Sequence, residues 1–133
     1  MMADDQTMMT VGELMAKCLQ AEGVKFMCGI VDGAHIPLVS HLGDYGIEYL
    51  NTHHEEAATH IAEAHARISH RPTVVIGNPG PGGANMLAGL TSAHGEGHPV
   101  VAIACTCLLY TSDAADDLPC VAFGGRRSLK TNN

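Results

Sequence analysis

The densest candidate for chemistry is residues 52–60, which read Thr-His-His-Glu-Glu-Ala-Ala-Thr-His. The simplest interpretation is a capping box, in which Thr52 caps a helix and Glu55, three residues later, bonds back to its amide. A zinc-protease site needs two imidazoles one turn apart, whereas His54 and His60 lie roughly 240° apart around a helix. The segment therefore predicts a helix start with an acidic side chain, and it does not predict a metal site.

A second candidate is the Gly/Pro-rich segment 77–85, which reads Gly-Asn-Pro-Gly-Pro-Gly-Gly-Ala-Asn. Its glycines would let a ligand approach the backbone closely, and a helix that starts there could accept an anion. The segment lacks the Gly-Lys-Ser/Thr of a phosphate-binding loop, and it does not fit Gly-x-Gly-x-x-Gly. Taken by itself, it favours a tight turn between a strand and a helix.

The remaining histidines and the 5 cysteines form no recognisable set. An odd number of cysteines at these spacings matches no disulfide framework, so reduced thiols are expected. Cys105 and Cys107 are too close together for a zinc knuckle, and no second pair follows. The histidines expected at the surface or in loops include His35, His41, His94 and His98.

Helix and strand patterns alternate along the chain in a way that would bring these segments together. Apolar residues at three-and-four spacing predict a helix over 10–24, and a β-branched run at 73–76 predicts a strand covered on both faces. The other expected strands are 26–30, 47–50 and 99–104, and the other expected helices are 36–42, 53–68 and 84–93. This alternation predicts an α/β fold with a mainly parallel sheet flanked by helices. Ligands of such sheets bind beyond the carboxyl ends of the strands, where Asp32-Gly33, residues 52–55 and residues 78–85 would meet.

Length and charge exclude several classes of protein. The 133 residues suffice for one domain with a core, and 7 basic against 14 acidic residues give a formal net charge of -7. A nucleic-acid or anionic-membrane partner would need a basic face, so neither is expected. No apolar run approaches the ~20 residues of a membrane span, and the start of the chain resembles no signal or transit peptide. We expect a cytoplasmic protein with a disordered N-terminus at 1–9.

The pattern changes after residue 106. Residues 107–117 read Cys-Leu-Leu-Tyr-Thr-Ser-Asp-Ala-Ala-Asp-Asp and resemble the translation of a transposase-based sequencing adapter, and 121–127 resemble a translated flow-cell primer. Segments of this kind are excluded from fold reasoning. The expected organisation is a partial domain over 10–106, followed by a non-native tail over 107–133, with the biological chain continuing differently past Thr106.

Together, the motifs resemble the N-terminal pyrimidine-binding domain of thiamine-diphosphate-dependent enzymes. They occur in family order, with Gly-Ile-Val-Asp-Gly-Ala at 29–34, His-Glu-Glu-Ala-Ala at 54–58, Ala-Arg at 66–67 and Gly-Pro-Gly-Gly-Ala-Asn at 80–85. The likeness covers residues 10–106 and is greatest to the acetolactate synthase and decarboxylase branch. The positions that depart from the family pattern, and that leave the substrate open, are Val31, Asp32, His53, His65 and Pro79.

The resemblance implies a mechanism and a set of site residues. In the family, the glutamate of the His-Glu-x-Ala-Ala motif hydrogen-bonds N1′ of the cofactor's aminopyrimidine and favours the tautomer that removes the C2 proton of the thiazolium. That residue is here Glu55, which is expected to be catalytic. Burial can raise the pKa of such a carboxyl, while the positive end of the helix opposes the shift. The residues expected to bind thiamine diphosphate are Glu55, Asp32, Gly33, Gly80, Pro81, Gly82 and Asn85.

The implied reaction is that of an acetolactate synthase, which decarboxylates one 2-keto acid and transfers the two-carbon unit to a second. A 2-keto-acid decarboxylase, or an aldehyde or acyl-CoA lyase, is the alternative within the family, and a non-catalytic α/β binding module is the alternative outside it. The family holds the diphosphate and its Mg²⁺ on a separate C-terminal domain donated by the partner subunit. The resemblance therefore implies a homo-oligomer, at least a dimer, no metal ligands in this domain, and an inactive fragment. Some members also carry FAD.

Overall fold

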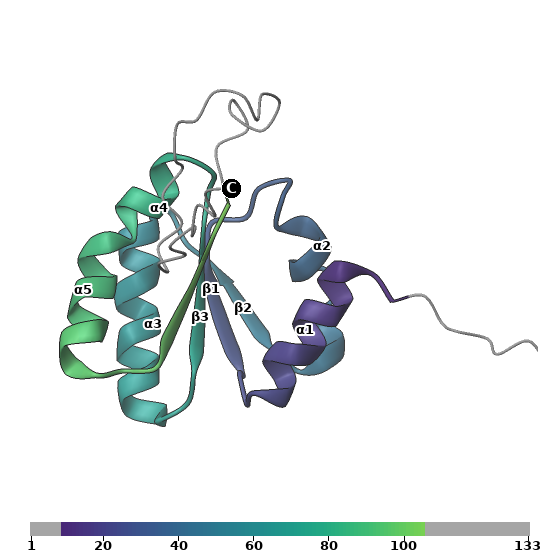
Figure 1. Ribbon diagram of the computed structural model, residues 1–133, viewed down its shortest axis with the longest axis horizontal. Helices are drawn as coiled ribbons and strands as arrows, with labels where there is room; N and C mark the ends of the chain where they lie inside the picture. The colour runs from purple at the N-terminus through teal and green to yellow at the C-terminus, as the bar shows by residue number, and fades with distance from the viewer. Residues whose placement is uncertain (1–8, 106–133) are drawn as a thin grey trace, which may run out of the picture.

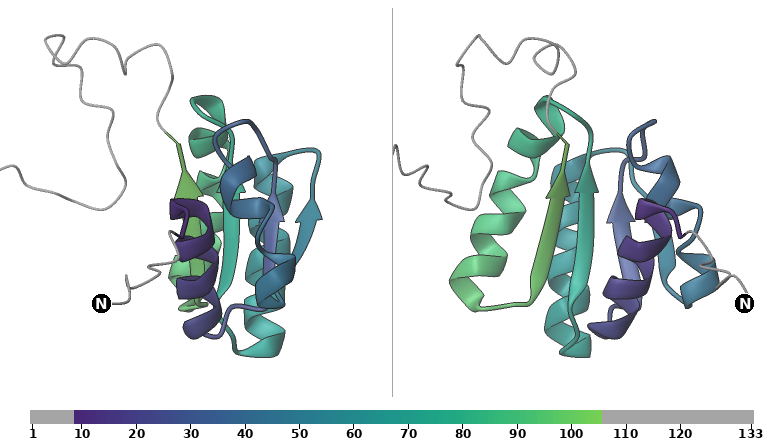
Figure 2. Two further views of the ribbon diagram at one scale, coloured as in Figure 1. Left: turned by 90° about the vertical axis from the view of Figure 1, so that its right-hand side faces the viewer. Right: turned by 45° about the vertical axis from the view of Figure 1, so that its right-hand side comes forward.

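Four parallel strands form the centre of the computed structural model, which describes residues 9–105 (Figure 1). They lie in the order β2-β1-β3-β4, and every neighbouring pair is parallel, so the arrows in Figure 2 point the same way. The strands are β1 (Phe26–Gly29), β2 (Glu48–Asn51), β3 (Thr73–Gly77) and β4 (Val100–Ala104). The predicted parallel α/β fold is therefore confirmed. The predictions of a disordered N-terminus and of an adapter-like tail fall on residues 1–8 and 106–133, outside the described residues.

Helices cover both faces of this sheet, as Figure 1 shows. One face carries α1 (Val11–Ala21), α2 (Ile36–Val39) and the short 3₁₀ helix η1 (Gly43–Tyr45). The other face carries α3 (Glu55–Ser69), α4 (Pro81–Asn85) and α5 (Leu87–Glu96). Each crossover between parallel strands runs through a helix, as a parallel sheet requires.

The core consists of two apolar layers, because alternate side chains of a strand point to opposite faces. On β1, Met27 packs under α1 and α2, whereas the next residue, Cys28, packs under α3. On β3, Val74 and Ile76 belong to the first layer and Val75 to the second. All of β3 is buried, which confirms the predicted strand with both faces covered. Burying each such side chain contributes roughly 1.5–3 kcal/mol, so β3 is a main source of stability.

The helices predicted over 36–42 and 84–93 differ most from the structure. The helix expected over 36–42 ends at Val39, because the chain tightens after it into i→i+3 bonds that continue through η1. The single helix expected over 84–93 is wrong, because the structure has two helices there, α4 (Pro81–Asn85) and α5 (Leu87–Glu96). α4 begins at Pro81, because Gly80 turns the chain with a φ of 84° and proline is suited to the first helical position. The Gly/Pro-rich segment is therefore partly helical.

Two glycines of α5 are expected to respond oppositely to alanine. A Cβ on Gly89 would lie 2.6 Å from Cβ of Thr59 on α3, whereas a Cβ on Gly95 would meet nothing within 4 Å. Gly89→Ala should lower the free energy of unfolding by about 1–3 kcal/mol through overpacking. Gly95→Ala should raise it by up to about 1 kcal/mol because alanine favours helix. Urea denaturation of the two variants checks this, and equal effects would contradict the close packing of α3 on α5.

Candidate active site

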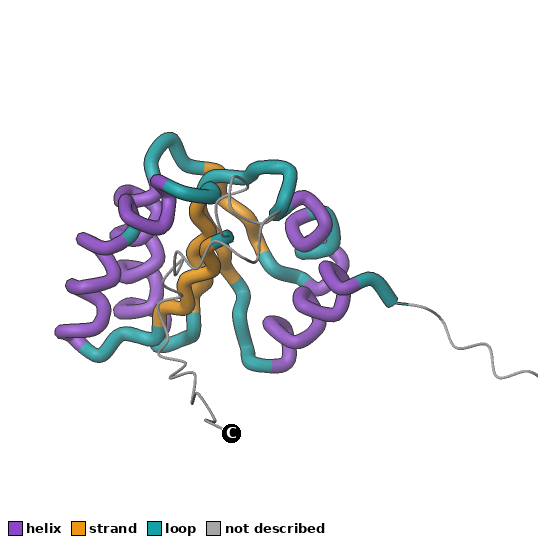
Figure 3. The backbone as a smooth tube through the Cα atoms, turned by 45° about the horizontal axis from the view of Figure 1, so that its top comes forward, coloured by secondary structure: helices purple, strands orange, loops and turns teal. Residues whose placement is uncertain are grey.

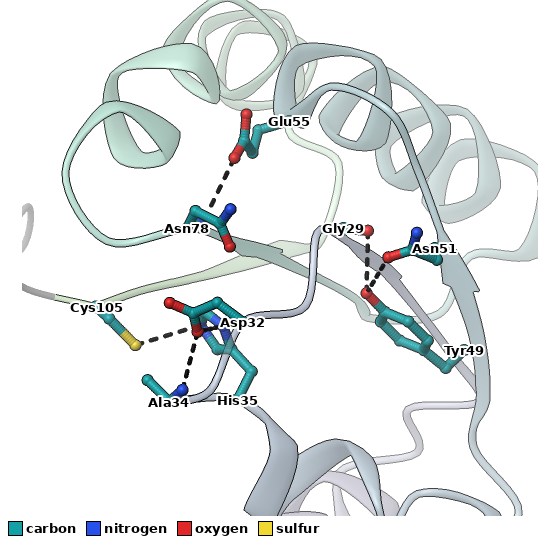
Figure 4. Close-up of polar contacts among 9 residues, drawn as sticks. All are labelled: Gly29, Asp32, Ala34, His35, Tyr49, Asn51, Glu55, Asn78 and Cys105. Carbon is teal, nitrogen blue, oxygen red and sulfur yellow. Dashed lines mark hydrogen bonds and ion pairs between the residues drawn. The ribbon is translucent and has the colours of Figure 1, made fainter.

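Glu55 is a buried carboxylate at the carboxyl edge of the sheet. It is the first residue of α3 and only 4% exposed, although burying an unpaired carboxylate is costly. Its Oε2 accepts a hydrogen bond from Nδ2 of Asn85 at 3.0 Å. Its Oε1 accepts from the backbone N–H of Asn78 at 3.4 Å, the bond drawn in Figure 4. The three residues come from the start of α3, the loop after β3 and the end of α4. Figure 3 shows the loops at this edge gathered above the ends of the strands.

The capping box predicted for this helix is wrong. The N-cap is His54, whose Nδ1 accepts from the backbone N–H of Glu56 at 3.2 Å, while the Thr52 hydroxyl donates to the carbonyl of His54 at 3.2 Å. His54 has extended backbone angles, φ -157° and ψ 140°, so the helix begins one residue later, at Glu55. Because His54 serves as the cap, the Glu55 side chain is free to point into the protein.

The pKa of Glu55 lies below its usual value. Burial favours the neutral acid and raises the pKa, but several effects oppose it and together prevail. They are the hydrogen bond from Asn85, the backbone N–H groups of Glu55 itself and of Asn78, and the positive charge available on His54. The carboxylate is consequently ionised at neutral pH and buried, an arrangement that makes it a strong acceptor of hydrogen bonds.

This pKa predicts how stability depends on pH. A carboxyl whose folded pKa is below its unfolded value, about 4.3, stabilises the fold above that value and loses the contribution as pH falls through the folded pKa. Glu55→Gln lacks the titrating group, so the difference in unfolding free energy between wild type and variant should shrink as the pH is lowered below about 4.3. Urea denaturation from pH 7 to pH 3 measures this difference. A difference that stays constant over that range would contradict the lowered pKa.

Gly82 allows α4 to lie directly against the carboxylate. A Cβ at this position would lie 2.8 Å from Oε1 of Glu55 and 2.9 Å from the backbone carbonyl carbon of Gly77. Pro81 occupies the first position of α4, and Gly80 forms the turn before it. Of the predicted cofactor-binding residues, the structure thus brings Gly82 and Asn85 against Glu55, with Gly80 and Pro81 shaping the same loop.

Asp32 and Gly33 lie in a different loop, between β1 and α2, and make contacts within it. Oδ1 of Asp32 accepts from the backbone N–H of Ala34 at 3.0 Å and lies 2.8 Å from Nδ1 of His35 (Figure 4). A Cβ on Gly33 would meet nothing within 4 Å. The loop is at the same edge of the sheet as Glu55, but the cofactor-binding role of these two residues stays a prediction.

The sequence placed Asn78 in the segment 78–85 expected at the ligand-binding edge but did not single it out as a binding residue; it directly follows β3. Its backbone N–H binds Glu55, and its side-chain Oδ1 is buried with no hydrogen-bond partner among the described residues. An unpaired buried acceptor is costly, so this oxygen is available to a donor from a ligand or from water. The sequence signal that could have identified Asn78 is its position at the carboxyl end of a buried strand.

The other histidines named above lie at the surface or in loops, as predicted, and two of them are not free in solvent. His35 precedes α2 and is only 2% exposed, and His98 lies between α5 and β4, where its Nδ1 forms a hydrogen bond of 2.8 Å with Oε1 of Glu63 on α3. Cys18, Cys28 and Cys105 are free thiols. Between residues 9 and 105, no group of three or more His, Cys, Asp and Glu side chains is arranged to hold a metal ion. No helix in that part of the chain has the length and apolar character to cross a membrane.

Comparison with known proteins places these features in a family. Residues 9–115 match the family described as "Thiamine pyrophosphate enzyme, N-terminal TPP binding domain". The chain is similar to the acetolactate synthase of Bacillus subtilis (strain 168), with 42% identity over 93 residues, covering 69% of this chain and 16% of that protein. It is also similar to the probable acetolactate synthase large subunit of Methanococcus aeolicus, with 39% identity over 95 residues, covering 71% of this chain and 16% of that protein. The chain thus spans about a sixth of the length of these curated relatives.

A solved structure agrees with this match. The thiamine diphosphate-dependent 4-hydroxybenzoylformate decarboxylase of Rhodococcus jostii RHA1 superposes with a TM-score of 0.66 and 25% identity, over 72% of this chain and 18% of that chain. The family match covers more than half of the sequence and includes every helix and strand described above. The chain belongs to the thiamine pyrophosphate enzymes and contains their N-terminal TPP binding domain.

Proposed function

We propose that this domain binds the aminopyrimidine part of thiamine diphosphate and that Glu55 is its catalytic acceptor. The observation that supports this most directly is the ionised Glu55 carboxylate, buried at the carboxyl edge of the sheet and bound by Asn85 and Asn78. Parallel α/β sheets bind ligands at this edge.

The residues present fit an aminopyrimidine. Such a ring carries a basic nitrogen, which donates to a carboxylate once it is protonated, and an amino group, which donates to a further hydrogen-bond acceptor. Glu55 supplies the first, and the unpartnered buried Oδ1 of Asn78 is available as the second. Gly82 leaves the space beside the carboxylate free of a side chain. When bound, the cofactor supplies an electron sink for the decarboxylation of 2-keto acids.

In this proposal Glu55 holds and returns a proton at its own carboxylate. An ionised carboxylate offers about four acceptor positions, and its protein partners are the N–H groups of Asn85, of Asn78 and of Glu55 itself. Capacity therefore remains for one more donor from the ligand. Asn85 and Asn78 fix the orientation of the carboxylate and keep it charged until that donor arrives.

For the complete protein we propose an acetolactate-synthase-like reaction in the cytoplasm, in which one 2-keto acid is decarboxylated and its two-carbon unit is transferred to a second. The similarity to two acetolactate synthases supports this assignment. We further propose that the diphosphate and Mg²⁺ are held by a domain outside residues 9–105, donated by a partner subunit in at least a dimer. A simple 2-keto-acid decarboxylase is the second candidate, supported by the similarity to the Rhodococcus decarboxylase.

The test uses the complete protein encoded by the gene. Calorimetric titration with thiamine diphosphate and Mg²⁺ should give saturable binding, and pyruvate should then yield acetolactate and CO₂. Release of an aldehyde without a coupled product would favour the decarboxylase instead. Absence of cofactor binding by the folded protein would overturn the proposal and favour a non-catalytic binding module. Flavin absorbance of the purified protein reports FAD independently.

A further inference from the structure

A second group of reactive side chains lies at the carboxyl edge of the sheet, formed by Asp32, His35 and Cys105. Nε2 of His35 lies 3.3 Å from Sγ of Cys105, within hydrogen-bond distance. On the other side of the ring, Nδ1 lies 2.8 Å from Oδ1 of Asp32, a close charge contact without hydrogen-bond geometry, and Nδ1 has no hydrogen-bond partner in the described part of the chain. His35 is 2% exposed, so the imidazole is enclosed between a thiol and a carboxylate (Figure 4).

This group adjoins the Glu55 site. His35 follows β1 and Cys105 follows β4, and both strands are neighbours of β3, so their contact passes the carboxyl end of β3. Ala104 pairs with Gly77 in the β3–β4 register, which places Cys105 beside Asn78, whose N–H binds Glu55.

The arrangement is that of an activated nucleophile. A thiol within reach of an imidazole, which is in turn oriented by a carboxylate, can lose its proton to that imidazole as it attacks. Burial, and then the charge of Asp32, raise the pKa of Cys105, so the resting group is the thiol and needs a base. The negative charge of Asp32, 2.8 Å from Nδ1, favours the tautomer with the proton on Nδ1, and in that tautomer Nε2 can accept the thiol proton.

We propose that Cys105 is a site of covalent modification by small disulfides, with His35 as its base and Asp32 as the residue that positions the base. In the reaction, His35 removes the thiol proton and the sulfur attacks one sulfur of the disulfide. The new S–S bond forms as the old one breaks, and the leaving thiolate takes the proton from His35. One disulfide replaces another, so no further oxidant is needed.

The other two described cysteines lack this arrangement and serve as internal references. Cys28 is buried, its thiol donates to the carbonyl of Ala58 at 3.1 Å, and burial raises its pKa to about 11. Cys18 is exposed on α1, and no histidine or acidic side chain of residues 9–105 hydrogen-bonds its thiol. Cys28 should therefore resist modification, and Cys18 should report the reactivity of an ordinary exposed thiol.

The experiment measures mixed-disulfide formation on the full chain. Wild type, His35→Gln and Asp32→Asn are treated with 4,4′-dithiodipyridine, quenched with acid at intervals, and digested for mass spectrometry of the peptides that contain Cys105 and Cys18, in which fragment ions distinguish Cys105 from Cys107. We expect both variants to modify Cys105 about 10-fold more slowly or slower still, relative to Cys18 in the same sample. Melting curves identify variants that remain folded.

The direction of the Asp32→Asn effect is decisive, since that side chain is partly exposed and its replacement is nearly isosteric. If resting thiolate were the nucleophile, removing the charge that raises the pKa of Cys105 would speed the reaction. A faster or unchanged rate in Asp32→Asn, an unchanged rate in a folded His35→Gln, or no reaction of wild-type Cys105 would each overturn the proposal. If His35→Gln does not fold, Asp32→Asn alone decides. The measurement needs no cofactor, so its outcome is independent of the function proposed for Glu55.

Discussion

Glu55→Gln is expected to lower turnover of a 2-keto acid by the complete enzyme about 10²–10⁴-fold, the range for removing a positioned proton-transfer group. Glutamine keeps the size of the side chain, and the amide of Asn85 can reverse so that its oxygen faces the new N–H donor. The fold should therefore survive, while the buried negative charge that accepts a proton is lost. Exchange of the cofactor's C2 proton for deuterium, followed by NMR, should slow in parallel with turnover.

Glu56→Gln provides the matched control. Glu56 is the next residue of α3, in the same first turn of the helix, but its side chain is exposed. The same chemical change there should leave proton exchange and turnover within a factor of about two of wild type. Equal losses in both variants would mean that charge at the helix start, rather than the placement of one carboxylate, explains the effect.

Gly82→Ala is expected to disrupt the site through packing alone. The added Cβ would meet Oε1 of Glu55 and the backbone of Gly77, and neither the buried carboxylate nor the strand end can move away freely. We expect a loss of about 1–3 kcal/mol in unfolding free energy. Binding of thiamine diphosphate by the complete enzyme should weaken as well, because α4 and Glu55 must separate to make room.

Gly83→Ala is the corresponding control, one position further along α4. Its nearest neighbour would be Cβ of Ala104 at 3.8 Å, an ordinary van der Waals contact. Alanine also favours helix over glycine, so stability should stay constant or rise by up to about 1 kcal/mol. Calorimetric titration and thermal melting of both variants separate the two positions. Similar behaviour of Gly82→Ala and Gly83→Ala would argue against close contact between α4 and Glu55.

The layered fold could be predicted from the sequence because its signals are local. Apolar runs such as 73–76 are short and unbroken, and glycine marks helix ends such as that of α1 near Gly23. The predicted helix boundaries were less accurate where a single residue determines the boundary. Pro81 begins α4 because proline suits the first helical position. The many glycines around it indicate a loop and so hide this preference.

The site could be predicted only where a motif names its residues. Glu55 and Asn85 belong to recognisable motifs, and the structure does join them. The spacing of Thr52 and Glu55 fits a capping box equally well, and the extended backbone of His54 decided against it. The contact between His35 and Cys105 joins residues 70 positions apart, and no periodicity in the sequence reports such a pair. Asn78 was not singled out within the segment 78–85 because it contributes to the site only a backbone N–H and one unpaired oxygen.

The composition of α4 has a consequence for how the site is maintained. Two of its five residues are glycine, its first is proline, and its N-terminus has no side-chain cap, so it has little intrinsic helical stability. Its order depends on packing against α3, α5 and β3, in contrast to the fifteen-residue α3, which positions Glu55. In amide hydrogen exchange, α4 should therefore open at lower free energy than α3. Part of the binding energy of a ligand at this site would then be used to keep α4 folded in place.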